Sequence, residues 1–254
     1  MKIYVGVTDY DWYSILKQEK CDEVNFWKPG GNTNFKAINV DDMFLFKLHS
    51  PNNFIVGGGF FVKHSILPTF LAWDVFGIKN GTYNLKQLND RVNKYKKRNN
   101  ILDNSQNIGC IILTEPFLFN EEEWIPVPED WASSIVQGKT YDTGAITGMR
   151  LYKQVNERLQ RQHIYENNAL IAESNDIRYG KEQLIKPRLG QGAFRIIVTE
   201  AYHRRCSITG EKTLPVLDAA HIKPFSESRP NISQKGILLR PDIHTLFDKG
   251  LWIE

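Results

Sequence analysis

The chain has 254 residues, 41% hydrophobic and 24% charged, which are the proportions of an ordinary globular protein rather than a disordered one. No run of about 18 apolar residues is present and the first residues turn polar early, which argues against a membrane span, a signal peptide and a membrane partner. The three cysteines form no Cys-X-X-Cys pair, so we expect no disulfide framework and a cytoplasmic location.

The net charge of +3 is unevenly distributed. Residues 1–150 hold 16 Lys or Arg against 17 Asp or Glu, whereas residues 151–254 hold 16 against 12. Within 178–240 there are 12 basic and 5 acidic residues. A basic second half favours a polyanionic partner such as nucleic acid, although a solvated surface would give the same counts.

The first 150 residues predict one mixed, strand-rich domain. Strands are expected at Lys2–Val7, Met43–Leu48, Phe54–Val56, Phe60–Val62 and Ile108–Leu113, and helices at Asp9–Gln18 and Asn84–Arg98. The three glycines 57–59 interrupt an apolar stretch, which indicates a β-bulge or a close backbone approach. The second helix ends in Lys94–Asn100, a basic run that is either a nucleic-acid patch or a solvated helix end.

The remaining chain predicts a connection and a second domain. Residues 151–187 are polar and partly helical, and 188–254 form the second domain. Its expected elements are a helix at Phe194–Tyr202, an extended segment that begins at Cys206–Thr209, a returning strand at Leu214–Ile222, a polar loop, and a helix at Asp242–Lys249 that Ile237–Leu239 leads into. Pro241 suits the first position of that helix and Gly250 its end.

Four residues of this second domain could carry chemistry. His244 and Asp248 are four apart on a predicted helix, so they share one face and could hold a divalent ion. Asp218 lies three residues before His221 on the preceding strand. One metal ion and one histidine outside its coordination shell suffice to hydrolyse a phosphodiester. Each feature alone is common as a structural pair, so the prediction rests on their combination.

A resemblance sharpens this prediction. The segment RLGQGAFRIIVTEAYHRRCSITGE…LPVLDAAHIKP…KGILLRPDIHTLFDKGL, residues 188–251, resembles the HNH endonuclease domain, in the subgroup with an AAHI core and an LRPDxHxLFDxG helix. The resemblance implies a ββα-metal nuclease that uses Mg²⁺ or Mn²⁺. It makes His221 the general base and His244 a metal ligand, with Asp248 as the second ligand on the helix.

Two positions depart from that pattern. Lys235 stands where the family has an Asn that orients the base histidine, and a charged lysine cannot accept a hydrogen bond. Asn231, four residues upstream, is a candidate substitute. Ala220 stands where many members carry a metal-binding Asp or His, and Asp218 points to the same side of the strand. Asp218 is therefore our candidate third ligand.

Positive side chains around this motif are expected to contact DNA. Phosphate contacts by Lys and Arg are blind to sequence, so they would supply affinity without selectivity. The candidates are Arg204, Arg205, Lys223 and Arg240.

The N-terminal half resembles the PUA-like superfamily, near the EVE and ASCH domains, through YVGVTDYDWYSIL, VNFWKPGG, FLFKLHSP, FIVGGGFF and AWDVFGIKNG. The resemblance implies a small curved β-barrel with flanking helices that holds a flipped, modified base in an aromatic pocket. Stacking on an aromatic face contributes roughly 1–3 kcal/mol per base. Our candidates for that pocket are Trp27, Trp12 and Phe60. Trp27 could equally belong to the core, and for Trp12 and Phe60 a core position is the more common role.

Together these features predict an α+β protein that cuts DNA near a modified cytosine, as in a modification-dependent restriction system. A double-strand break would require two such sites, which favours a homodimer. Two alternatives stay open: an RNA-directed or nicking HNH nuclease, and a catalytically impaired DNA-binding protein.

Overall fold

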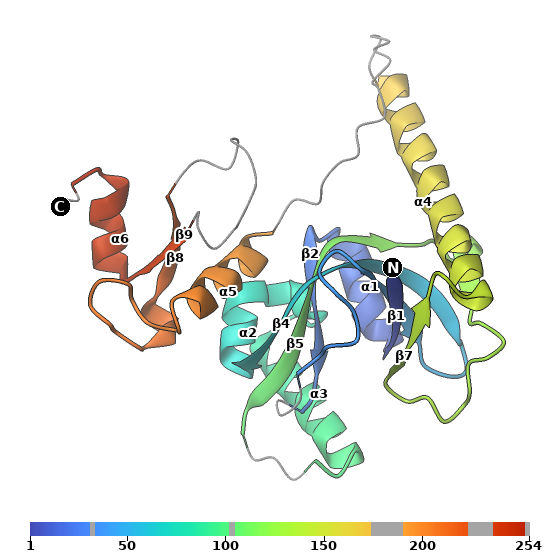
Figure 1. The fold of residues 1–254 in the computed structure, drawn as a ribbon, viewed down its shortest axis with the longest axis horizontal. Helices are drawn as coiled ribbons and strands as arrows, with labels where there is room; N and C mark the ends of the chain where they lie inside the picture. The colour runs from blue at the N-terminus through green and yellow to red at the C-terminus, as the bar shows by residue number, and fades with distance from the viewer. Residues whose placement is uncertain (31–33, 102–104, 174–189, 223–235, 252–254) are drawn as a thin grey trace.

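The computed structural model describes residues 1–30, 34–101, 105–173, 190–222 and 236–251 (Figure 1). The strands are β1 (Lys2–Thr8), β2 (Glu23–Lys28), β3 (Met43–Leu48), β4 (Phe54–Pro68), β5 (Asn107–Leu118), β6 (Ile125–Pro126), β7 (Gly138–Asp142), β8 (Asp218–His221) and β9 (Gly236–Leu239). The helices are α1 (Tyr10–Glu19), α2 (Thr69–Phe76), α3 (Leu85–Arg98), α4 (Ile146–Glu173), α5 (Gln191–Ala201) and α6 (Pro241–Asp248), with 3₁₀ turns at Gly77–Asn80, Glu121–Glu123 and Leu214–Val216. The predicted α+β class is confirmed.

The N-terminal domain is built on one mixed sheet of seven strands in the order β2-β5-β4-β3-β1-β7, with β6 beside β4. β1 and β3 are parallel, and the other pairs are antiparallel. The two strands predicted around Gly57–Gly59 are one strand, β4, whose register with β5 shifts between Gly58 and Phe60. A Cβ on Gly58 would lie 2.6 Å from the Phe44 carbonyl oxygen, so both the predicted bulge and the close approach are confirmed.

Helices cover both faces of this sheet. Alternate residues of a strand point to opposite sides, so each strand contributes side chains to the core on either face. Phe44 of β3 and Ile111 of β5 pack against α1. Their neighbours point the other way, Leu45 into the core beneath α4 and Cys110 into the core beneath α2, α3 and α5. Burial raises the pKa of the Cys110 thiol to about 12, so this cysteine is an inert core residue.

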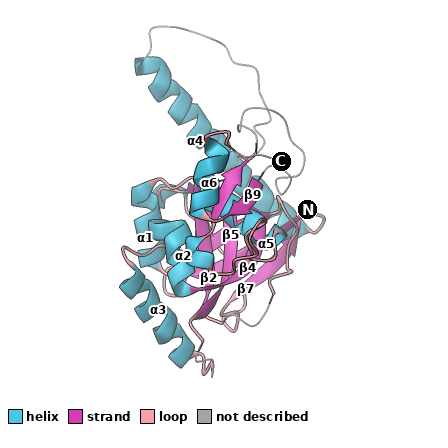
Figure 2. Cartoon of the chain, turned by 90° about the vertical axis from the view of Figure 1, so that its left-hand side faces the viewer, coloured by secondary structure: helices cyan, strands magenta, loops and turns pink. Residues whose placement is uncertain are grey.

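The C-terminal unit consists of the β8–β9 hairpin with α6, and α5 lies between it and the N-terminal sheet (Figure 1). One face of α5 joins the N-terminal core through Ala193 and Ile196. The other joins the C-terminal core through Phe194 and Val198. Helix α4 instead extends beyond the sheet in both views (Figures 1 and 2).

The predicted strand pairing of Cys206–Thr209 with Leu214–Ile222 is wrong. Residues 206–211 close a turn, in which the Gly210 amide donates to the Cys206 carbonyl and the Cys206 amide to the Glu211 carbonyl. Pro215 then lies in a 3₁₀ turn. Only Asp218–His221 remains extended, and it pairs with Gly236–Leu239 across the loop. In the described part of the chain, no helix is long and apolar enough to cross a membrane.

Candidate functional site

His244 occupies the centre of the polar cluster on the ββα unit. It lies on the first half of α6, which starts at Pro241, and it faces β8. Its Nδ1 lies 3.4 Å from a carboxylate oxygen of Asp218, and its Nε2 lies 3.5 Å from one of Asp248. Three of the predicted side chains are therefore brought together, with the imidazole half-buried between two more exposed carboxylates.

These three side chains do not converge on one point. Asp218 and Asp248 face different nitrogens of the same ring, and a metal ion can bond only one of the two. Consistently, the described residues contain no cluster of three or more His, Cys, Asp or Glu side chains arranged for a metal ion.

The donors still suit a hard divalent cation. Mg²⁺ is often bound by one or two protein ligands, the rest being water and substrate phosphate. A metal-binding histidine also commonly donates its second N–H to a carboxylate, which fixes the ring. The geometry fits His244 and one carboxylate as ligands, with the other carboxylate orienting the ring.

His221 lies at the other end of β8 from Asp218. It is paired with Gly236, and its odd spacing from Asp218 turns the two side chains to different faces of the strand, although α6 also reaches the His221 face, where Ile243 packs in one cluster with Leu238 and Ala219. Three residues of extended chain separate His221 from Asp218, roughly 10 Å between their Cα atoms. With the two side chains on different faces, His221 is not placed to share an ion with Asp218, and it lies at the exposed end of the strand.

The ring of His221 stacks on Phe194 of α5, with 3.8 Å between the ring centroids and 6° between their planes. Phe194 is buried. One face of the imidazole is therefore covered by the protein, although the residue as a whole is exposed.

The predicted phosphate contacts fall into different environments. The Arg204 guanidinium donates to the Ile66 carbonyl at 2.9 Å, so it also connects the turn after α5 to β4. Arg240 forms a two-point ion pair with Asp242. Arg205 is exposed. Lys223, together with the predicted catalytic residues Asn231 and Lys235, lies outside the described residues.

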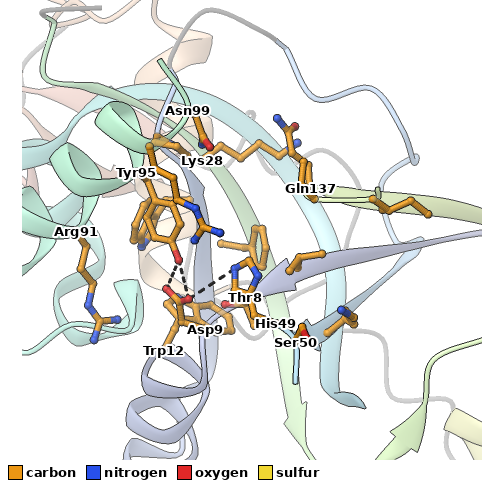
Figure 3. Close-up of a pocket in the computed structure, with 18 of the residues that line it drawn as sticks. Thr8, Asp9, Trp12, Lys28, His49, Ser50, Arg91, Tyr95, Asn99 and Gln137 are labelled. Carbon is orange, nitrogen blue, oxygen red and sulfur yellow. Dashed lines mark hydrogen bonds and ion pairs between the residues drawn. The ribbon is translucent and has the colours of Figure 1, made fainter. Parts of the chain in front are cut away.

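A second site is a pocket of about 770 Å³ in the N-terminal domain (Figure 3). It lies where β1, β2 and β3 end, beside the C-terminal half of α3 and the segment 127–137. This volume is within the range of pockets that hold small ligands. Four cations and one carboxylate are among the described side chains that line it: Lys28, Lys47, Arg91, Arg98 and Asp9.

Asp9 is the polar centre of this pocket. It occupies the position before α1, where an aspartate ordinarily caps the helix, yet its side chain makes no capping hydrogen bond. It instead accepts from the Tyr95 hydroxyl at 2.5 and 2.6 Å and lies 3.6 Å from His49 Nε2 (Figure 3). Asp9 therefore makes contacts with residues distant in the sequence in place of a helix cap.

Burial shifts the pKa values of several side chains that line this pocket. Burial lowers the pKa of His49, only partly opposed by Asp9, so its ring is neutral at pH 7 and offers one donor and one acceptor. Burial also raises the pKa of Tyr95, and its hydrogen bond to Asp9 raises it further, so its hydroxyl stays a donor. Poor hydration lowers the pKa of Lys28 and Lys47, which are therefore cations that would gain from an anionic ligand.

The three aromatic residues predicted for the pocket occupy different positions relative to it. Trp27 lines the pocket, its indole N–H donates to the Asn80 carbonyl at 3.0 Å, and its ring meets Tyr95 edge to face. Trp12 reaches the pocket but is 3% exposed and packs against Phe26 and Phe46, so it is mainly a core residue. Phe60 does not line the pocket; it packs near Phe117 beneath α4.

Sequence reasoning missed Asp9, His49 and Tyr95 as site residues. The basic run Lys94–Asn100 was a usable indication, because Tyr95, Arg98 and Asn99 all line the pocket. No local pattern marked Asp9 or His49.

Residues 206–253 match the family model described as HNH endonuclease, which supports a nuclease, a hydrolase of phosphodiester bonds. Among solved structures, the chain is similar to the ASCH protein of Zymomonas mobilis. A mutant of that protein has a TM-score of 0.39 at 7% identity, covering 59% of this chain and 94% of that one. Another crystal structure of the protein has a TM-score of 0.32 at 8% identity, covering 47% and 74%. No curated protein sequence matches the chain.

Proposed function

We propose that this protein is a DNA endonuclease whose C-terminal unit hydrolyses phosphodiester bonds and whose N-terminal pocket selects DNA that carries a modified cytosine. The observation that carries the nuclease part is His244, set between Asp218 and Asp248 on a ββα unit that matches the HNH endonuclease family. The two partly exposed carboxylates of this cluster supply oxygen donors of the kind that Mg²⁺ and Mn²⁺ prefer.

In this proposal, His221 takes a proton from the attacking water, because a histidine outside the metal's reach keeps a basic nitrogen. A divalent ion held by His244 and one of the two neighbouring carboxylates would neutralise charge at the scissile phosphate. The carboxylate opposite the metal-bound nitrogen holds the His244 ring. Arg205, exposed in the turn that follows α5, contributes a phosphate contact.

The recognition of modified cytosine is assigned, in this proposal, to the pocket around Asp9. A flipped cytosine presents an exocyclic amine that donates hydrogen bonds, and the Asp9 carboxylate is an acceptor for it. Trp27 supplies an aromatic wall, and Lys28 a poorly hydrated cation near the phosphate path. The volume exceeds that of one base, which leaves room for a substituent on the ring.

A cleavage assay tests both parts. Matched duplexes with unmodified, 5-methyl and 5-hydroxymethyl cytosine, and an RNA of the same sequence, are incubated with Mg²⁺, Mn²⁺ or EDTA. We expect metal-dependent cutting of the modified duplexes, lost in His221→Ala. Cutting of RNA alone would favour the RNA-directed alternative, and binding without cutting would favour the DNA-binding alternative.

A further inference from the structure

The base histidine of the proposed site is held by a side chain from outside the ββα unit. The Phe194 and His221 rings are nearly parallel, with 6° between their planes, and their centroids are 3.8 Å apart. A contact of this kind engages the face of the imidazole and does not use its ring nitrogens. It therefore fixes the plane of the ring while leaving proton transfer to the ring edge.

Phe194 is itself rigidly placed. It is buried in a cluster with Val198, Leu217 and Leu238. A Cβ on Gly236 would lie 2.6 Å from its ring, so the strand that pairs with His221 presses on the same side chain. A phenyl ring enclosed in this way has little room to move and can act as a fixed platform.

The helix that carries Phe194 is anchored on the N-terminal domain. The buried carboxylate of Glu23 accepts hydrogen bonds from the amides of Gly192 and Ala193, just before Phe194, at 2.8 and 2.9 Å. On the last turn, Glu200 forms an ion pair with Lys63 at 2.6 Å. Both ends of α5 are thus fixed to strands of the sheet domain.

We infer that Phe194 is a positioning residue for His221, and that the N-terminal domain, through α5, forms part of the framework that orients the nuclease's general base. This inference rests on the proposed function of His221. Phe194 touches neither substrate nor metal in this scheme; it acts by limiting the orientations of the imidazole.

The test compares Phe194→Leu with Val198→Ala in the full chain. Both substitutions remove buried apolar volume from one cluster, but only the first removes the platform. In ¹³C-histidine-labelled wild type, the ring protons of His221, identified by their absence in His221→Ala, should be shifted upfield by the Phe194 ring current. Phe194→Leu should lose that shift, and Val198→Ala should keep it.

Kinetics on cleavable DNA give the second readout. Phe194→Leu should lower kcat by about 10- to 100-fold, the effect of a misplaced catalytic group, with KM changed less than about twofold. Val198→Ala should keep the kcat of the wild type. Urea unfolding of both variants checks that they are folded, and Phe194→Met, with a pliant side chain of similar size, replaces Phe194→Leu if that variant unfolds.

Two results would overturn the inference: no upfield shift of His221 in the wild type, or an unchanged kcat in a folded Phe194 variant. Failure of the proposed function gives a different result from failure of this inference. A wild-type chain that shows the upfield shift but cuts no nucleic acid would refute His221 as a base, and with it the positioning role, while the contact itself stood.

Discussion

Replacing Glu23 with alanine tests how the two parts of the chain are joined. Its side chain is fully buried, accepts two amide hydrogen bonds from the start of α5 and pairs with Lys79 at 2.9 Å. Removing it leaves two buried N–H groups at about 1–3 kcal/mol each. Lys79 keeps a second ion-pair partner, Asp22, at 2.6 Å, so the substitution does not leave its ammonium group unpaired. We therefore expect a loss of about 2–6 kcal/mol.

The matched control is Asp22→Asn, which removes the exposed carboxylate from the same lysine. Asp22 has 64% of its side chain exposed, and an exposed ion pair contributes about 0–1 kcal/mol. Urea unfolding gives the two stabilities, and hydrogen exchange of the Gly192 and Ala193 amides reports on the contact itself. Exchange should accelerate in Glu23→Ala alone. Equal stabilities of the two variants, or unchanged exchange, would refute the argument that Glu23 anchors α5.

Four other substitutions, with Phe60→Ala as a control, address the two sites. His221→Ala should abolish cutting while metal and DNA binding measured by calorimetry stay within about twofold, and a loss of metal affinity would show it to be a ligand. Asp218→Asn and Asp248→Asn should both weaken Mg²⁺ binding, about 10-fold or more for the direct ligand; a titration in which neither changes would remove the ion from this cluster. Trp27→Ala should abolish the preference of the full chain for modified over unmodified duplex, by about 1–3 kcal/mol, whereas Phe60→Ala, remote from the pocket, should keep it.

Some features were readable from the sequence because they depend on near neighbours. The spacing of His244 and Asp248 fixes them on one helical face, and they meet through the ring of His244. Strand alternation put Asp218 on the same side of the strand as Ala220, and the structure places Asp218 against His244 of α6 and His221 against Phe194 of α5. The glycine run likewise predicted the bulge of β4.

The sequence alone determined that the chain contains both helices and strands. It also identified the candidate residues of the ββα unit, and it identified Trp27 as a candidate pocket aromatic. Only the tertiary structure decided which segments meet. Asp9, His49 and Tyr95 come from three separate parts of the chain, and β8 pairs with β9 rather than with residues 206–209. The anchoring of α5 on Glu23 joins residues about 170 positions apart. Local periodicity records which face of an element is apolar, but it carries no information about the partner of that face, because pairing and docking are settled by packing across the whole chain.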